Sequence, residues 1–275
     1  MNTKPLVSVI ITTKNSAPTM DPLLKSVKEQ NYKNIETVVV DNRSTDKTAD
    51  IARKYTSLVF QKGPERSAQR NFGAQKSRGK YLLFLDSDMV LTNNVVKDCV
   101  ETFERDNNKL GGLVVPERSF GQGLWAKAKI LEREINRGEG FFESARFFPK
   151  KIFMSFKGYD ENLTGPEDWD LPQRIRKTYT IGRIKSFINH NEGELSLSTL
   201  FRKKMYYGLS ASKYLTKHKI SIISPTTIYF LRPAFYKNWR MLLTDPVVSL
   251  GMLVMLSVEF IGGGIGYLKG SLKIE

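Results

Sequence analysis

The chain has little cysteine and little histidine, and both shortages narrow its chemistry. Its 275 residues include one cysteine, Cys99, and two histidines, His190 and His218. A single cysteine cannot form an intrachain disulfide, and it offers no cysteine-based zinc site. Two histidines do not make a histidine-rich metal cage. Both kinds of metal site are therefore excluded.

Acidic residues are scarce in one long stretch. The formal net charge is +15, and residues 171–240 hold 14 Lys/Arg against two acids, Glu192 and Glu194. Such a basic block indicates a nucleic acid, an anionic membrane surface or a phosphorylated substrate as the partner. The chain carries no signature of a nucleic-acid-binding module, so no nucleic acid is expected. It also opens without a signal-peptide pattern, which predicts a cytoplasmic location.

Apolar residues make up 40% of the chain, enough for a packed core, and their spacing changes along it. Strand-like and helix-like patterns alternate in the first part, which predicts a doubly wound, mostly parallel α/β sheet with helices on both faces. The expected strands are residues 6–12, 35–40, 58–60, 81–85 and 111–115. The expected helices are residues 18–30, 66–78, 94–105 and 122–136, one that is capped at 44–46 and ends near 55, and one that opens at Glu167.

Two carboxylates end the apolar run 81–85. Asp86 and Asp88 stand one residue apart, and along an extended chain such residues point to the same side. Ligands collect at the carboxyl ends of parallel strands, and hard divalent cations take oxygen ligands and bridge to phosphates. The pair therefore indicates a Mg²⁺ or Mn²⁺ site, although an acidic turn is the simpler alternative.

Five short motifs matter together, by their order and spacing along the chain. They are VSVIITTKN at residues 7–15, VVVDNRSTD at 38–46, RNFG at 70–73, DSD at 86–88 and GPED at 165–168. Together they resemble glycosyltransferase family 2, whose members have a GT-A fold, use nucleotide-sugar donors and invert the anomeric centre. The resemblance covers residues 6–195 and implies a GT-A catalytic domain over residues 1–195.

The resemblance also implies that loop residues after the first strand and the acid ending the second strand hold the nucleotide; here they are Thr12, Thr13, Asn15 and Asp41. Arg66 and Arg70 lie one helical turn apart, and the guanidinium fork of either suits the diphosphate. Asp86 and Glu167 are the other expected donor contacts. Asp41 can instead be a simple turn residue, and Arg66 can lie on a solvated helix face. Many relatives have an acid where this chain has Asn15 and Asn42, which leaves the preferred base open.

The metal and the catalytic base follow from the same resemblance. Asp88 is expected to bind Mg²⁺ or Mn²⁺ directly, and Asp86 to meet the metal through water or the ribose. His190 is expected as a third metal or diphosphate contact, with a purely structural role as the alternative. Asp168 is expected to be the catalytic base that takes the proton of the acceptor hydroxyl. Glu167 and Asp170 are alternatives for the base, although Asp170 lies about 200° around a helix from Asp168.

The last 80 residues predict a different kind of structure. Residues 198–217 mix lysines with apolar residues in a pattern typical of a basic amphipathic helix on an anionic surface. Residues 246–268 carry a single charge, Glu259, and are long enough to span a bilayer. An interfacial hairpin and a homo-oligomer formed by apolar helices are the alternatives. Residues 196–275 are therefore expected to be a membrane-associating region.

Two functions from different classes remain. The first is an inverting, metal-dependent glycosyltransferase that acts on a lipid-linked or glycan acceptor at the cytoplasmic membrane face. The second is a catalytically silent GT-A module that binds a partner and anchors it at the membrane. The presence of Asp86, Asp88 and Asp168 favours the enzyme.

Overall fold

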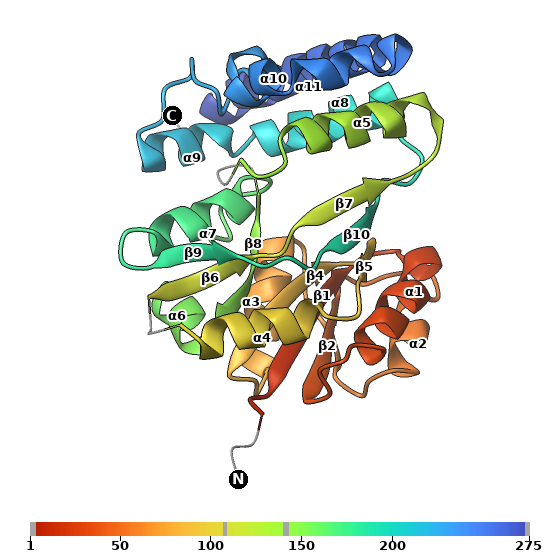
Figure 1. Ribbon diagram of the computed structural model, residues 1–275, viewed down its shortest axis with the longest axis vertical. Helices are drawn as coiled ribbons and strands as arrows, with labels where there is room; N and C mark the ends of the chain where they lie inside the picture. The colour runs from red at the N-terminus through yellow and green to blue at the C-terminus, as the bar shows by residue number, and fades with distance from the viewer. Residues whose placement is uncertain (1–3, 107–108, 140–142, 273–275) are drawn as a thin grey trace. The chain divides into compact units, whose positions relative to one another are not determined.

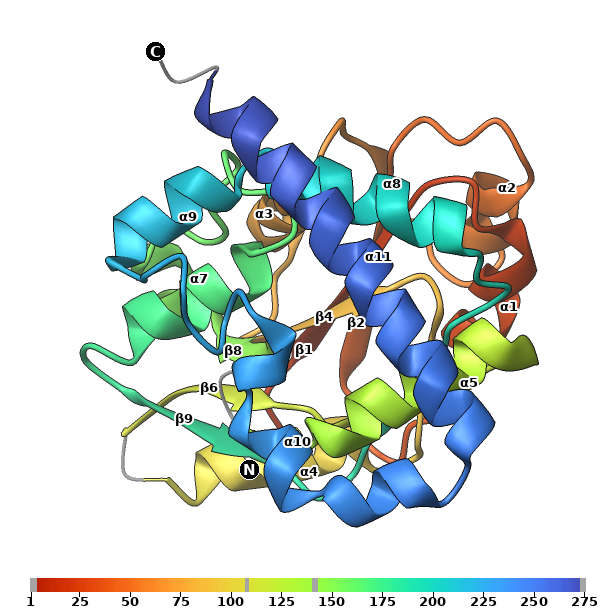
Figure 2. The ribbon, with the colours of Figure 1, turned by 90° about the horizontal axis from the view of Figure 1, so that it is seen from above.

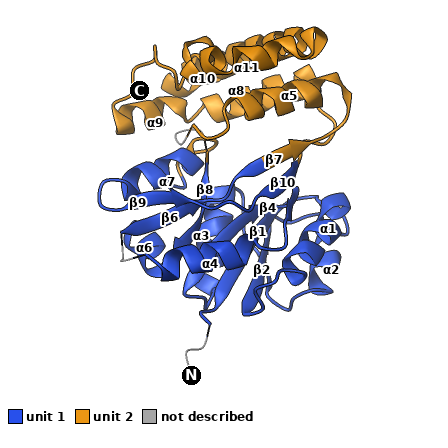
Figure 3. Ribbon diagram, in the orientation of Figure 1, with its two compact units in different colours: residues 1–117, 144–161, 167–190 blue, residues 118–143, 162–166, 191–275 orange. Residues whose placement is uncertain are grey.

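The structure, a computed structural model, describes residues 4–106, 109–139 and 143–272. Its chain forms two compact units that interleave along the sequence (Figure 3). Two segments before residue 195, residues 118–143 and 162–166, group with the C-terminal helices. The expected domain boundary at residue 195 stays a prediction. The first unit comprises residues 1–117, 144–161 and 167–190, and the second comprises residues 118–143, 162–166 and 191–275.

The first unit is built on a seven-stranded sheet (Figure 1). Its strand order is β3-β2-β1-β4-β8-β6-β9. The first four strands of this order run parallel, β8 is antiparallel to both of its neighbours, and β9 is parallel to β6. The prediction of a mostly parallel α/β sheet is confirmed. The strands are β1 (Val7–Thr13), β2 (Ile35–Asp41), β3 (Val59–Gln61), β4 (Tyr81–Asp86), β6 (Leu110–Val114), β8 (Ala145–Pro149) and β9 (Thr180–Arg183).

Helices cover both faces of this sheet because its strands bury side chains on both sides. Successive residues of a strand point to opposite faces. In β4, Leu83 and Leu85 join one core, while Leu82 and Phe84 join the other. Residues of α1 and α4 complete the first core, and residues of α3, α6 and α7 complete the second. The helices of this unit are α1 (Ala17–Lys28), α2 (Thr48–Arg53), α3 (Arg66–Lys76), α4 (Val95–Glu104), α6 (Lys150–Ser155) and α7 (Glu167–Ile175).

A small second sheet was not predicted from the sequence. Its order is β5 (Met89–Leu91), β10 (Ile188–Asn191) and β7 (Glu117–Phe120). β5 and β10 are antiparallel, and His190 stands opposite Met89. These strands have three or four residues each, too short to give a periodic pattern. Their pairing brings His190 beside the segment that follows Asp86.

The second unit is helical. Its core contains Ala128, Leu200, Phe235 and Met255, which come from four different helices. The helices are α5 (Gly123–Ile135), α8 (Leu197–Gly208), α9 (Ala211–His218), α10 (Pro233–Lys237) and α11 (Pro246–Ser271), with the 3-10 turns η1 (Tyr229–Leu231) and η2 (Trp239–Leu243).

The single helix expected over residues 198–217 is two helices, α8 and α9. The Ser210 hydroxyl, between them, donates to the carbonyl of Thr164 at 2.9 Å and accepts from its N–H at 3.0 Å. The break between α8 and α9 thus falls at a residue whose hydroxyl is bonded to the backbone of a distant segment.

The apolar segment near the C-terminus is one continuous helix rather than a hairpin. α11 has 26 residues, and the Asp245 side chain caps it by accepting from the N–H of Val248 at 3.1 Å. The glycine run 262–264 does not interrupt it. By length and composition alone this helix is able to cross a membrane, and 33% of its most apolar window is buried within the protein.

Candidate functional site

The donor residues expected from the sequence meet at one edge of the parallel sheet. β1 pairs in register with β2 and β4, so that Thr13 lies beside Asp41 and Thr12 beside Asp86. The carboxyl ends of parallel strands share one edge, where ligands bind in open α/β sheets. The sheet therefore brings together residues that lie more than 70 positions apart in the chain.

The loops after β1 and β2 are fastened to each other. Asn15 adopts a left-handed backbone conformation with φ of 49°. Its N–H donates to the Ser44 hydroxyl at 2.7 Å, and its side-chain oxygen accepts from the N–H of Thr45 at 2.8 Å. Asp41, which is almost fully buried, accepts from the N–H and the hydroxyl of Ser44. Asp41 thus holds its own turn, and nucleotide binding by Asp41 and Asn15 stays a prediction.

Two threonine hydroxyls at this edge have no hydrogen-bond partner in the described part of the chain. Thr12 and Thr13 are buried, and the Oγ1 atoms of both lack a partner. Buried polar atoms are normally satisfied. Nearby, the Gln69 side chain donates to the carbonyls of Thr13 and Val40 at 3.1 and 2.7 Å. The unpaired hydroxyls are consistent with the donor contacts expected of Thr12 and Thr13, which remain predictions.

Arg70 joins carboxylates from two separate elements. Its guanidinium lies 2.8 Å from Asp86 at the end of β4, 2.6 Å from Asp168 in α7, and 3.5 Å from Glu167. The side chain is 1% exposed. Burial opposes the charged form of Arg70, but the carboxylates of Asp168 and Asp86 outweigh it and raise its pKa well above the ordinary value. The role expected of Arg70 at the diphosphate stays a prediction, and what its contacts show is a link between two acids.

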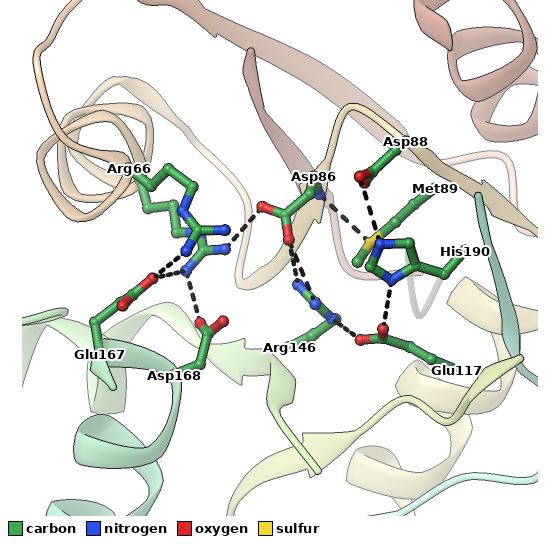
Figure 4. A network of polar contacts seen from close by, with 10 residues as sticks. Arg66, Asp86, Asp88, Met89, Glu117, Arg146, Glu167, Asp168 and His190 are labelled. Carbon is green, nitrogen blue, oxygen red and sulfur yellow. Dashed lines mark hydrogen bonds and ion pairs between the residues drawn. The ribbon is translucent and has the colours of Figure 1, made fainter. Parts of the chain in front are cut away.

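The three acids of α7 differ in their surroundings (Figure 4 shows Glu167 and Asp168). Asp168 has a side chain that is 16% exposed, so it can meet a substrate. Glu167 is 2% exposed, and burial followed by the charge of Asp168 raises its pKa. Asp170 is fully buried and pairs with Arg174 at 2.8 Å. This geometry favours Asp168 over Glu167 and Asp170 as the base.

Arg66 lies one helical turn before Arg70 and is more accessible. Its guanidinium is 3.2 Å from Glu167, and its side chain is 37% exposed. Arginine presents a planar fork that suits phosphate oxygens. Arg66 is therefore the better placed of the two arginines for the expected diphosphate contact.

Sequence reasoning missed a second bridge of ion pairs at this edge (Figure 4). Arg146 of β8 lies 2.7 Å from Glu117 and 3.4 Å from the second oxygen of Asp86. The other oxygen of Glu117 lies 2.8 Å from Nδ1 of His190. Burial disfavours the charge on Asp86, but Arg70 and Arg146 outweigh it and hold its pKa well below the usual range. The one signal in the sequence was a charged residue inside the apolar strand 145–149.

Asp88 and His190 lie next to each other, and metal binding by Asp88, Asp86 and His190 stays a prediction. His190 Nε2 lies 3.4 Å from one oxygen of Asp88, and the other oxygen of Asp88 is buried without a partner among the described residues. Asp86 already engages two arginines. No group of three or more His, Cys, Asp or Glu residues suited to a metal occurs in the part of the chain that the structure describes. The carboxylate of Asp88 and the imidazole of His190 offer one oxygen and one nitrogen ligand, a set that suits Mn²⁺ better than Mg²⁺, with water and phosphate oxygens as the remaining ligands.

The chain is similar to known proteins in both sequence and fold. A family model described as glycosyl transferase family 2 matches residues 8–161. An uncharacterized glycosyltransferase of Rickettsia prowazekii (strain Madrid E) is 32% identical, with 94% of this chain and 90% of that protein covered.

Two solved structures share the fold. The mannosyltransferase PcManGT from Pyrobaculum calidifontis, in complex with GDP-Man and Mn²⁺, superposes with a TM-score of 0.58 at 17% identity, covering 100% of this chain and 82% of that one. A fragment of S. aureus TarS in complex with UDP-GlcNAc superposes with a TM-score of 0.54 at 17% identity, covering 98% and 92%.

Proposed function

The chain belongs to glycosyltransferase family 2, and from that premise we propose that it transfers one sugar, with inversion and with a divalent metal, from a nucleotide sugar to a lipid-linked acceptor at the cytoplasmic membrane face. The family membership and the GT-A fold establish a glycosyltransferase. The metal, the acceptor and the location belong to the proposal.

The observation that carries the proposed mechanism is the Arg70 bridge. One buried guanidinium holds Asp168 at 2.6 Å and Asp86 at 2.8 Å. Asp168 is thereby fixed close to the strand end where the donor is expected. In the proposed reaction Asp168 takes the proton of the acceptor hydroxyl while the oxygen of that hydroxyl attacks the anomeric carbon. Attack from the face opposite the leaving nucleoside diphosphate inverts that carbon.

The site also supports a divalent ion. Asp88 and His190 are the residues that would hold it, and the unpaired oxygen of Asp88 is the observation in favour. When bound, Mg²⁺ or Mn²⁺ would stabilise the negative charge of the departing diphosphate. Arg66, which is partly exposed, would contact the same diphosphate from α3.

The charge and the apolar surface of the C-terminal region support a lipid-linked acceptor. Residues 171–240 are strongly basic, and the cytoplasmic leaflet is anionic. α11 is long and apolar enough to associate with a membrane. An enzyme held at the membrane meets a lipid-linked acceptor at a raised effective concentration.

The test is donor turnover with the full-length protein. A panel of UDP-sugars and GDP-sugars is incubated with Mn²⁺, with and without membrane lipid extract, and release of nucleoside diphosphate is measured. We expect release with one donor, and we expect lipid extract to increase it. Asp168→Asn should lose release while still binding the donor. Absence of release with every donor, despite donor binding, would favour the silent binding module.

A further inference from the structure

The outward face of α11 is apolar apart from Ser257 and, near the C-terminal end, Lys269. A helix of 26 residues is about 39 Å long. A helix that covers a soluble protein normally presents polar residues to water. In α11 the apolar side chains on this face, which we call the outer face, are 41–68% exposed. They are Val247, Leu250, Leu253, Val254, Phe260, Ile261 and Leu268, and Leu272, 75% exposed, follows directly after the helix.

The opposite face of α11 packs closely on α8. A Cβ added at Gly266 would lie 2.1 Å from the carbonyl oxygen of Met205, and one at Gly262 would lie 2.7 Å from that of Phe201. Figure 2 shows α11 running across α8 and α5. Small residues that let helix backbones approach are characteristic of helix pairs in membranes. This packing buries the inner face of α11 and leaves the apolar side chains of the outer face exposed.

The only ionisable residue within the apolar part of α11 points inward. The Glu259 side chain is fully buried, and its oxygens lie 2.8 Å from Lys129 of α5 and 3.2 Å from Lys204 of α8. Removing one partner of such a pair leaves a buried charge, which is costly. Glu259 therefore fixes the rotation of α11 about its axis. The charge lies inside and the apolar residues lie outside, the reverse of a soluble helix.

The same contacts argue against α11 crossing a bilayer. A spanning orientation would take Glu259 away from Lys129 and Lys204, or would carry parts of α5 and α8 into the hydrocarbon. α8 presents the exposed, charged side chains of Arg202 and Lys203, which do not suit that medium. A helix that keeps its contacts with α5 and α8 has to lie along the surface.

The charge of the region that carries the outer face indicates its occupant. From residue 196 to residue 272 the chain has ten Lys/Arg and two acids, Asp245 and Glu259. Lys204 and Arg232 are held in ion pairs with Glu259 and Glu132, and Arg202 and Lys203 are exposed. Exposed aromatic side chains, Tyr236 and Trp239, precede α11 and are 68% and 52% exposed. Aromatic rings favour the boundary between headgroups and acyl chains, and lysines favour anionic headgroups. This combination matches an anionic lipid surface.

We propose that α11 lies in the plane of an anionic bilayer, with its outer face inserted at the headgroup boundary and its inner face fixed to α5 and α8. The unit is thus monotopic, attached from one side only. This inference deepens the proposed function, because it defines how the enzyme meets a lipid-linked acceptor. Only the link to a lipid-linked acceptor rests on the proposed function. Binding to lipid is measurable without any transfer.

The first experiment measures vesicle binding of the full-length chain. Sedimentation is compared with vesicles of phosphatidylcholine alone and of phosphatidylcholine with phosphatidylglycerol. The triple substitution Leu250→Glu, Val254→Glu and Ile261→Glu should weaken binding at least tenfold, since each apolar side chain contributes to insertion. The control Met154→Glu adds a charge at an exposed apolar residue of α6 and should leave binding unchanged. Donor affinity checks that both variants fold.

Equal vesicle binding by the triple variant and the wild type would overturn the proposal. So would a wild-type dimer in light scattering that the triple variant dissociates while vesicle binding persists, because the outer face would then bind a second copy. Vesicle binding without transfer to any lipid-linked acceptor would support lipid binding by the outer face and refute the proposed acceptor.

The second experiment separates lying on the bilayer from crossing it. Thr244→Cys and Ser271→Cys, made one at a time, place a thiol at each end of α11, while Cys99 is buried. A membrane-impermeant maleimide is added outside sealed vesicles that carry the protein. Both thiols should react before detergent is added. A thiol that reacts only after detergent would show that α11 crosses the bilayer.

Discussion

Removing the Arg70 guanidinium should destabilise the first unit more than any other single change at the site. Arg70→Met keeps the length and apolar character of the stem and leaves the carboxylates of Asp86, Asp168 and Glu167 without their shared cation. Breaking a buried ion pair from one side costs about 3–5 kcal/mol. At about 2–4 °C per kcal/mol, the melting temperature should fall by about 6–20 °C.

The stability lost in Arg70→Met should depend on pH in a direction set by the pKa of Asp86. Burial opposes ionisation of Asp86, but Arg70 and Arg146 hold its pKa well below the usual range. Its contribution to stability is therefore fully present above the pKa of an unfolded aspartate, about 3.9, and is lost as the pH falls through the folded value. The gap between wild type and Arg70→Met should be widest near neutral pH and should narrow below pH ~4.

The measurement is urea and thermal unfolding of both proteins from about pH 2 to about pH 7.5, so that the range extends well below the ordinary carboxyl pKa. Arg66→Met is the matched control, because Arg66 lies on the same helix, is 37% exposed and lies 3.2 Å from Glu167. It should cost about 1 kcal/mol or less. A gap for Arg70→Met that did not change with pH would refute the electrostatic account and would point to lost packing on the Tyr159 ring, whose centre is 5.0 Å away.

Three further predictions concern chemistry. Asp168→Asn should lower kcat by about 10²-fold or more with donor affinity unchanged, and a collapse of donor binding would make Asp168 a binding residue instead. Asp88→Ala should abolish transfer without unfolding the chain, and a chelator should reproduce the loss until Mg²⁺ or Mn²⁺ is restored; full activity in excess chelator would end the metal proposal. Glu117→Gln should weaken Mn²⁺ binding to the folded protein by about 10–100-fold, measured by electron paramagnetic resonance, since Glu117 orients His190 through Nδ1 at 2.8 Å. Unchanged Mn²⁺ affinity would leave Glu117 with a structural role only.

Much of the fold was predictable because its signals are local. The strands β1, β2 and β4 are apolar runs that end in polar residues, and the helices between them show regular apolar spacing. Strands alternating with helices allow few arrangements other than a parallel sheet. Such a sheet places all carboxyl ends at one edge, so the meeting of Thr12, Asp41 and Asp86 followed from topology alone.

The partners of those residues were not predictable, because a charge pattern does not say which charges will meet. Arg70 was expected at the diphosphate, yet its contacts are Asp86 and Asp168, and Asp168 lies 98 positions away. Arg146 gave only the weak signal of one charge inside an apolar strand, and Glu117 is followed by a charge of opposite sign, Arg118, in a strand of four residues. Burial decides these pairings, because a charge removed from water is tolerated only beside its opposite.

In the C-terminal region, too, the sequence determined some features and the packing decided others. Its composition by itself determined that residues 246–268 are apolar and that the segment before them is basic. Whether the helix is continuous, which face it buries and where Glu259 points were decided only by packing against α5 and α8. Apolar spacing cannot distinguish the two faces of a helix that is apolar all round. The faces became different only when Lys129 and Lys204 paired with Glu259 and the glycines met the α8 backbone.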